Sequence, residues 1–213
     1  MNRVIAYVWA VAVLVFAHLA PATAQPVQLT EDISFFDLQI DGKTIRIQRN
    51  QDNAARLTDD FSKTSRPCPP FCIHPISAAP GVDTYGEIEV LRFLNEKVQT
   101  GEGLLVDARI TEWHDKGTIP GSVNLPFHLL SAEDNPYFAR ILTALGAREA
   151  GGAWDFTEAK ALVLFCNGPW CDQSPRAIKS LISAGYPTQK LKYYRGGMQA
   201  WKLLGLTIVT PQG

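Results

Sequence analysis

The sequence carries no excess of charge of one sign. Its 20 lysines and arginines balance 21 aspartates and glutamates, which gives a formal net charge of −1. Proteins that bind nucleic acids normally gather basic residues into a patch or stripe, and this chain has none, so no nucleic-acid partner is expected. The chain has only four histidines and four cysteines. They form neither a standard zinc pattern nor a haem-attachment motif, so we expect no metal and no cofactor.

Long hydrophobic runs are also lacking, except at the N-terminus. There Arg3 precedes an uncharged stretch from Val4 to Ala22, and Ala22-Thr23-Ala24 offers a small-residue cleavage site. A membrane anchor is the alternative, but the segment from His18 to Ala24 shortens the apolar core below the roughly 20 residues of a spanning helix. Residues 1–24 are therefore predicted to be a signal peptide that directs secretion across the inner membrane. The cleaved protein is expected in the periplasm, without membrane contact.

Residues 25–81 are predicted to form an N-terminal extension. "FFDLQIDGKTIRIQRN" has partial apolar alternation on both sides of Asp41-Gly42, which favours a β-hairpin. "PCPPFCIHP" contains four prolines, which exclude a regular helix or a central strand. Its Cys68 and Cys72 are candidates for a structural disulfide in an exported protein. His74 follows them, but only three ligands are visible and no metal is predicted.

Residues 82–213 alternate between strand and helix patterns. The predicted elements are a helix over Gly86–Val98, strands in "GLLVDAR" and "GSVNLPF", a helix over Asn135–Leu145, a strand in "ALVLFC", a helix capped by Ser174 and ending at Gly185, a strand in "KLKYYRGG", and a helix over Met198–Leu204. This alternation predicts an α/β fold with a central parallel sheet covered by helices on both faces. Ligands of such sheets bind at the carboxyl ends of the strands.

Cys166 ends the most apolar of these strands, and residues 167–173 connect it to the next helix. Amide groups of the loop and the helix dipole favour negative charge, so this sulfur is expected to be a better thiolate than a free cysteine of pKa about 8.5. Gly168 is expected to give the loop φ values that other residues avoid. A nucleophilic Cys166 is favoured over a half-buried structural cysteine, which is the alternative.

Three motifs, in this order, resemble those of the rhodanese-like domain family: "LLVDARITEWHDKGTIPGSVNLPF", "LVLFCNGPWCDQSPRAI" and "KLKYYRGGMQAWKLLGLTIV". The resemblance covers Thr84 to Thr210. It implies a thiol sulfurtransferase in which Cys166 accepts a sulfane sulfur as a persulfide and passes it to a thiophilic acceptor. The implied partners are a small sulfur donor and a thiol acceptor, protein thiols included. The implied substrate-binding loop comprises Asn167, Gly168, Pro169, Trp170, Asp172, Gln173 and Ser174. Asp107 and Arg109 match residues of the family that are more often structural than catalytic.

The loop departs from the family in its charge. The usual loop is shorter and often has an arginine just before the serine, whereas this one has no basic residue and adds Asp172. Thiosulfate, a dianion, is therefore not expected to be the preferred donor. Arg195, at the end of a predicted strand, is the one candidate for recruiting an anion. Trp170 is expected either to wall the pocket of an apolar thiol or to cover the edge of the core.

Cys171 is the second departure, and it leaves alternatives open. As a resolving or accessory thiol it would attack a persulfide on Cys166, and the protein would then be a periplasmic dithiol/disulfide redox protein. As a passive loop residue it would leave Cys166 to carry sulfur alone, which is the interpretation we favour. A third alternative is a non-catalytic rhodanese-like binding module whose pocket holds an oxyanion or a peptide.

Overall fold

The computed structural model describes residues 26–40, 42–131 and 135–211. The signal peptide predicted for residues 1–24 and Asp41 of the predicted hairpin turn lie outside these ranges. Within them, no helix has the length and apolar character needed to cross a bilayer. The same residues contain no group of three or more metal-ligating side chains arranged to hold an ion.

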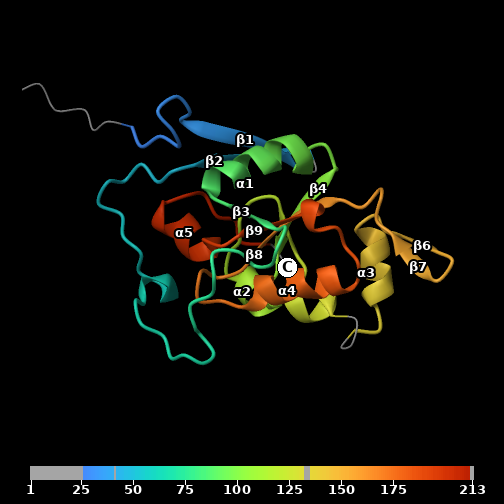
Figure 1. The fold of residues 1–213 in the computed structure, drawn as a ribbon. Coiled ribbons are helices and arrows are strands. Elements are labelled where there is room, and N and C mark those ends of the chain that lie inside the picture. The colour runs from blue at the N-terminus through green and yellow to red at the C-terminus, as the bar shows by residue number, and fades with distance from the viewer. Residues whose placement is uncertain (1–25, 41, 132–134, 212–213) are drawn as a thin grey trace, which may run out of the picture.

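A five-stranded parallel sheet forms the centre of the fold (Figure 1), as the alternating pattern predicted. Its strands lie in the order β3 (Asp83–Tyr85), β9 (Leu191–Tyr194), β8 (Ala161–Phe165), β4 (Gly103–Asp107) and β5 (Ser122–Asn124). Every neighbouring pair is parallel. Four of the five residues of the central strand β8 are buried, because both of its faces are covered by other elements. Its run of apolar residues is explained by this double burial.

Helices cover both faces of the sheet (Figure 1). On one face lie α1 (Glu87–Phe93), its continuation as a π-helix over Leu94–Val98, and α5 (Gly197–Leu203). On the other lie α3 (Phe138–Ala144) and α4 (Gln173–Ser183). The two apolar clusters share β8: Val163 and Phe165 pack with α1 and α5, whereas Leu162 and Leu164 pack with α3 and α4. The short elements are η1 (Asp60–Ser62), α2 (Thr111–Asp115), η3 (Phe127–Leu130) and η4 (Thr188–Lys190).

The predicted N-terminal hairpin is present. It consists of β1 (Phe35–Ile40) and β2 (Lys43–Gln48), which pair antiparallel. Leu38 and Ile47 are fully buried in the same cluster as Leu94 of the π-helix. The hairpin therefore extends the core on the α1 side of the sheet instead of standing free in solvent.

A second hairpin was not predicted from the sequence. It joins β6 (Arg148–Ala150) to β7 (Ala153–Asp155) through Gly151 and Gly152, whose φ angles are 61° and 84°. A two-residue hairpin turn of type I′ needs positive φ at both positions, and two glycines adopt it without steric cost. The predicted helix over Asn135–Leu145 also begins later, at Phe138, because the Asn135 Oδ1 accepts from the Tyr137 amide (2.9 Å) and forms a turn before it.

Candidate functional site

Cys166 follows β8 directly and lies at the carboxyl edge of the central sheet, below the start of α4. Only 2% of its surface is exposed. The Ser174 hydroxyl donates to its Sγ at 3.1 Å, and the Sγ lies 3.2 Å from the carbonyl oxygen of Cys171. The site is therefore an enclosed cradle around one sulfur atom.

The role predicted for Ser174 was wrong in one respect. The helix α4 begins at Gln173 with Asp172 as its N-cap, and the Arg176 amide donates to the Asp172 carbonyl at 2.9 Å. Ser174 lies within the first turn. Its hydroxyl is then free of any capping role and bonds to Cys166, while its amide also reaches that sulfur.

The two cysteines of the loop have opposite acidities. Burial alone would raise the pKa of Cys166, but hydrogen bonds from the Cys171 thiol, the Ser174 hydroxyl and the amides of Ser174 and Gly168 lower it below its ordinary value. Burial raises the pKa of Cys171, and its contact with the Cys166 sulfur raises it further. The pair thus favours one thiolate, on Cys166, beside one neutral thiol.

Cys171, like Cys166, is buried and forms no disulfide. Its Sγ lies 3.7 Å from the Gln173 Oε1, which accepts from the thiol, and 3.9 Å from the Asn167 Nδ2. The thiol hydrogen has a carbonyl acceptor when Cys166 is neutral and a sulfur anion nearby when Cys166 is ionised. The structure thus places the Cys171 thiol next to Cys166. The sequence alone could not establish that the two are neighbours.

A buried ion pair between Arg109 and Asp107 supports the loop that follows Cys166. Arg109 and Asp107 are 1% and 0% exposed, and the Arg109 Nε donates to the Asp107 Oδ1 at 2.8 Å. The Thr118 hydroxyl donates to the same carboxylate at 2.8 Å. The Arg109 Nη1 lies 3.5 Å from the Asn167 Oδ1. The ion pair therefore connects the end of β4 to Asn167, the residue that follows Cys166. Its position is one of structural support for the loop.

The start of α5 packs against the other side of the loop. The Met198 amide donates to the Cys166 carbonyl (3.0 Å), and Gly197 lies so close that a Cβ there would be 2.3 Å from the same oxygen. Gly168, by contrast, does not have the positive φ expected from the sequence. It is glycine because a Cβ would crowd the Gln199 side chain at 3.0 Å and the Trp170 indole at 3.2 Å.

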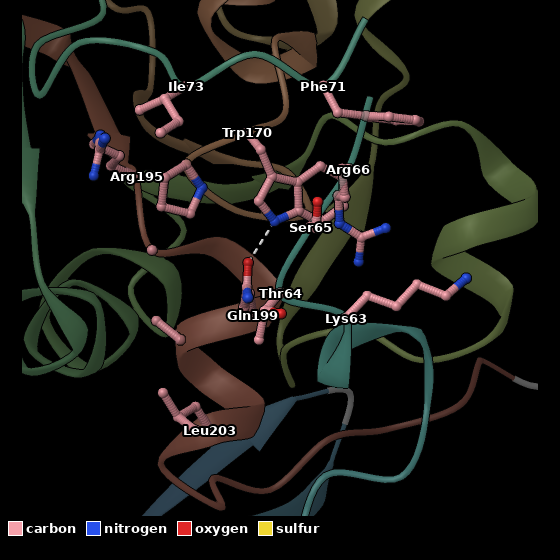
Figure 2. A pocket seen from close by; sticks show the side chains of 13 residues that line it. Lys63, Thr64, Ser65, Arg66, Phe71, Ile73, Trp170, Arg195, Gln199 and Leu203 are labelled. Atoms are coloured by element: carbon pink, nitrogen blue, oxygen red, sulfur yellow. Dashed lines mark hydrogen bonds between the residues drawn. The ribbon is translucent and has the colours of Figure 1, made fainter. Parts of the chain in front are cut away.

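The N-terminal extension lies over the outer part of the loop (Figure 2). The His74 amide donates to the Pro169 carbonyl at 2.9 Å, and Phe71 meets Trp170 edge to face with ring centroids 5.6 Å apart. The Arg66 guanidinium lies 3.9 Å from the centre of the Trp170 ring. Sequence analysis did not identify Arg66 or Phe71 as site residues, since no local pattern signals a contact made across about a hundred residues of chain.

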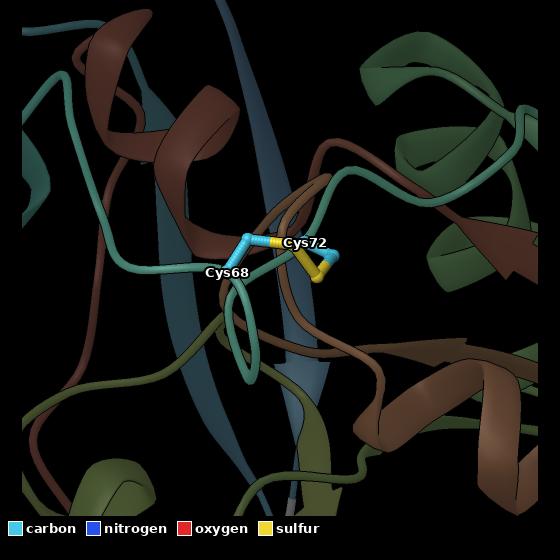
Figure 3. The surroundings of a disulfide bond; sticks show 2 residues. All are labelled: Cys68 and Cys72. Atoms are coloured by element: carbon cyan, nitrogen blue, oxygen red, sulfur yellow. A yellow bond between two sulfur atoms is a disulfide. The ribbon is translucent and has the colours of Figure 1, made fainter.

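The proline-rich segment of the extension is closed on itself. Cys68 and Cys72 are joined through their sulfur atoms in the structure (Figure 3). This link lies next to Phe71, which contacts Trp170 of the loop that follows Cys166. It lies in the extension and involves neither cysteine of the loop.

Arg195 follows β9 at the edge of the sheet, as expected, but much of its hydrogen-bonding capacity is used by the extension. Its Nη2 donates to the His74 carbonyl at 2.8 Å and its Nε to the Pro75 carbonyl at 3.1 Å. The guanidinium therefore fastens the extension to the sheet edge, and no acidic side chain neutralises it among the residues described.

Tyr193 is a further site residue that sequence analysis missed. It is 1% exposed, and its hydroxyl is buried without a hydrogen-bond partner in the described part of the chain. In the sheet it stands opposite Leu164, two residues before Cys166 and on the same face. Burial raises the pKa of the Tyr193 phenol, and the negative charge of Cys166 raises it further. Both effects keep the Tyr193 hydroxyl neutral.

The sequence is similar to a family model and to a curated protein. A family model described as a rhodanese-like domain matches residues 90–204. The HTH-type transcriptional regulator Rv0324 of Mycobacterium tuberculosis (strain ATCC 25618 / H37Rv) is 29% identical over 126 residues, which cover 59% of this chain and 44% of the regulator. The chain thus spans less than half the length of this curated relative.

Solved structures with similarity include three proteins of different origin. The human single-domain sulfurtransferase TSTD1 is 22% identical, with 58% of this chain and 96% of that one covered and a TM-score of 0.40. RPA3614 of Rhodopseudomonas palustris CGA009, a protein of unknown function described as a possible tyrosine phosphatase, is 23% identical, with 62% of this chain and 88% of that one covered and a TM-score of 0.44. An As-Sb reductase from Leishmania major is 20% identical, with 58% and 79% covered and a TM-score of 0.41.

The family model spans more than half of the 213 residues, and it includes β4, β8, β9 and the loop that holds Cys166. The parallel sheet with helices on both faces is the architecture that the alternation of strand and helix patterns predicted. The chain therefore belongs to the rhodanese-like domain family.

Proposed function

We propose that the protein is a sulfurtransferase in which Cys166 carries a sulfane sulfur as a persulfide. The observation that carries the proposal is the set of donors around one buried sulfur: the Ser174 hydroxyl at 3.1 Å and the amides of Gly168 and Ser174. These donors lower the pKa of Cys166, and a thiolate is the nucleophilic form of cysteine. They would stabilise the anion of a persulfide in the same way.

Two displacements make up the proposed reaction. First, the Cys166 thiolate attacks the sulfane sulfur of a donor, a bond forms between the two sulfur atoms, and the rest of the donor leaves with the electron pair of the broken bond. Second, an acceptor thiolate attacks the outer sulfur of the persulfide, and Cys166 leaves as the thiolate. The sulfur moves with no net oxidation of the protein, so no cofactor is required.

The neighbours of Cys166 have distinct parts in this proposal. Ser174 and the loop amides hold negative charge on the cysteine sulfur throughout the cycle. Arg109 and Asp107 are positioning residues, because they reach the loop only through Asn167. Cys166 is 2% exposed, so donor entry requires the loop or its covering segment to move.

The proposal is tested by steady-state sulfur transfer with the reduced protein, from thiosulfate and from an organic thiosulfonate to cyanide and to a small thiol. Transfer is expected with at least one donor, and Cys166→Ser is expected to fall to the uncatalysed rate. Cys171→Ser is the matched control, because it changes the other buried thiol of the same loop. Equal rates for the wild type and Cys166→Ser would contradict the proposal. A Cys166 that also resists alkylation would favour a non-catalytic binding module.

A dithiol cycle is the second candidate, and the contact between Cys171 and Cys166 favours it. In this cycle the Cys171 thiolate attacks the inner sulfur of the Cys166 persulfide, a disulfide forms, and hydrosulfide leaves. An external dithiol then reduces the disulfide. Peptide mapping after reaction with a donor distinguishes the two candidates: a Cys166–Cys171 disulfide supports the cycle, and a Cys171 that is always free contradicts it.

We also propose that the protein is exported to the periplasm, with Cys68 and Cys72 as a lasting disulfide. The N-terminal sequence motif supports export, and an oxidising compartment preserves such bonds. N-terminal sequencing of protein recovered from the periplasm is expected to begin at Gln25. A chain that keeps Arg3, or that is found with both Cys68 and Cys72 reduced, would contradict this.

The proposed partners are a small sulfur donor and a thiol acceptor. Both small thiols and protein thiols are to be tested as acceptors.

A further inference from the structure

A cavity of about 640 Å³ lies between the N-terminal extension and the outer side of the active-site loop (Figure 2). Arg66 and Phe71 line it from the extension, and Trp170 lines it from the loop. Arg195 and Gln199 close it from the sheet edge and from α5. Pro169 and Trp170 form one wall, so a ligand in this cavity contacts the loop that holds Cys166. Cys166 does not line the cavity, and a bound ligand reaches its sulfur only when the loop or its covering segment moves.

The charge of this cavity is positive. Lys63, Arg66 and Arg195 line it, and no aspartate or glutamate is among its lining residues in the described part of the chain. Lys63 pairs with the exposed Asp60 at 2.8 Å. Arg66 and Arg195 donate only to backbone carbonyls in the described residues, which leaves their charges without a paired carboxylate. An anion is the ligand that this arrangement favours.

One donor of the Arg66 side chain has no partner among the described residues. The Nε of Arg66 is buried and makes no hydrogen bond within the described residues, although its Nη2 donates to the Asp60 carbonyl at 2.6 Å. A buried N–H of a charged group is costly to leave unpaired. The guanidinium is held over the Trp170 ring, which fixes its plane at the cavity wall.

The rest of the wall is apolar and partly exposed. Phe71 is 37% exposed and Leu203 is 70% exposed, and Trp170 presents its indole between them. The Trp170 Nε1 is already used, since it donates to the Gln199 Oε1 (Figure 2). An inorganic anion would leave this apolar surface in water, whereas an organic anion would cover it.

We infer that this cavity binds an organic anion, with an acidic group held by Arg66 and an apolar body against Phe71 and Trp170. The extension would thereby supply the positive charge that the active-site loop lacks. The inference rests on the proposed sulfur transfer only for the ligand's role, which is that of an organic sulfur donor such as a thiosulfonate. Binding itself requires no reaction.

Binding is tested first with an unreactive probe. Benzenesulfonate is titrated into the full mature chain carrying Cys166→Ser, by calorimetry, so that turnover has no influence. Saturable binding is expected, and Arg66→Gln on the same background is expected to weaken it about tenfold, as loss of a charge-assisted hydrogen bond implies. Arg140→Gln is the matched control, because Arg140 is an exposed arginine outside the cavity lining and its loss should leave the affinity unchanged.

Specificity is tested second, in the protein with Cys166 intact. The ratio of kcat/KM for benzenethiosulfonate to that for thiosulfate is expected to exceed one and to fall in Arg66→Gln. Arg66→Lys keeps the charge and should restore part of the affinity that Arg66→Gln loses. This variant separates the effect of the lost charge from the effect of a loosened extension. Absence of benzenesulfonate binding, or equal affinities in Arg66→Gln and Arg140→Gln, would overturn the inference. Binding without any sulfur transfer would support the site and contradict only the proposed function.

Discussion

The Ser174 hydroxyl donates to the Sγ of Cys166 at 3.1 Å, and the amide of the same serine also reaches that sulfur. One residue in the first turn of α4 thus gives two donors to this sulfur. The helix start adds a partial positive charge at the same point. The pKa of Cys166 therefore depends on which residue begins α4, and variants of the neighbouring residues test this through the measured pKa.

Ser174→Ala should raise the pKa of Cys166. The hydroxyl stabilises the thiolate and not the thiol, so its loss disfavours ionisation, and a hydrogen bond to a charged group corresponds to about one to two pKa units. The pH dependence of iodoacetamide alkylation of Cys166 gives the value directly. Ser180→Ala, in the same helix, is the control and should leave the midpoint in place. An identical midpoint in Ser174→Ala and the wild type would contradict the assignment.

Cys171→Ala should also raise the pKa of Cys166, because the neutral Cys171 thiol donates toward the anion. Cys171→Ser keeps a donor at this position and should shift the midpoint less than alanine does. Alkylation profiles of the two variants, compared at equal protein concentration, test this order. A fall in the midpoint for Cys171→Ala would mean that the second thiol opposes ionisation.

Breaking the buried ion pair should destabilise the fold. Arg109→Met leaves Asp107 as a buried carboxylate without its partner, and the loss of one partner typically costs about 3–5 kcal/mol. Urea unfolding followed by circular dichroism measures the change in the free energy of unfolding. Lys116→Gln removes an exposed pair with Glu112 and should change that free energy little. Similar changes in the free energy of unfolding for the two variants would show that the buried pair stabilises the fold no more than the exposed pair does.

Phe71→Ala should expose Cys166 to reagents more often. Cys166 is 2% exposed, so alkylation occurs from opened forms, and Phe71 holds the extension against Trp170. An aromatic pair is worth about 0.5–1.5 kcal/mol, which corresponds to roughly a two- to tenfold faster alkylation. Ile76→Ala changes an exposed side chain of the same segment and serves as the control. An unchanged alkylation rate in Phe71→Ala would mean that the extension does not limit access.

The periodicity of the sequence was sufficient to predict the sheet and its covering helices. The apolar run of β8 and the position of Cys166 at its end are both local, so they were visible without a structure. The second hairpin was missed although Gly151-Gly152 is a local turn signal. Its strands are exposed and lack the apolar alternation on which strand prediction depends.

The surroundings of Cys166 were less predictable, because they depend on contacts between distant segments. Arg66 and Phe71 reach Trp170 from the extension, and nothing in the proline-rich segment indicates this contact. Arg195 was placed correctly at the sheet edge, but the extension takes two of its nitrogens. The start of α4 was misplaced because serine before proline is a strong capping pattern that Asp172 replaces here.

The central claim is that Cys166 carries the transferred sulfur. Its most direct test is the mass of the reduced mature protein after brief incubation with a sulfur donor and removal of the excess, followed by peptide mapping under non-reducing conditions. The account predicts an added mass of one sulfur atom on the peptide that contains Cys166, lost again on addition of an acceptor thiol and absent from Cys166→Ser. An unmodified Cys166 with every donor, or the same added sulfur in Cys166→Ser, would contradict it.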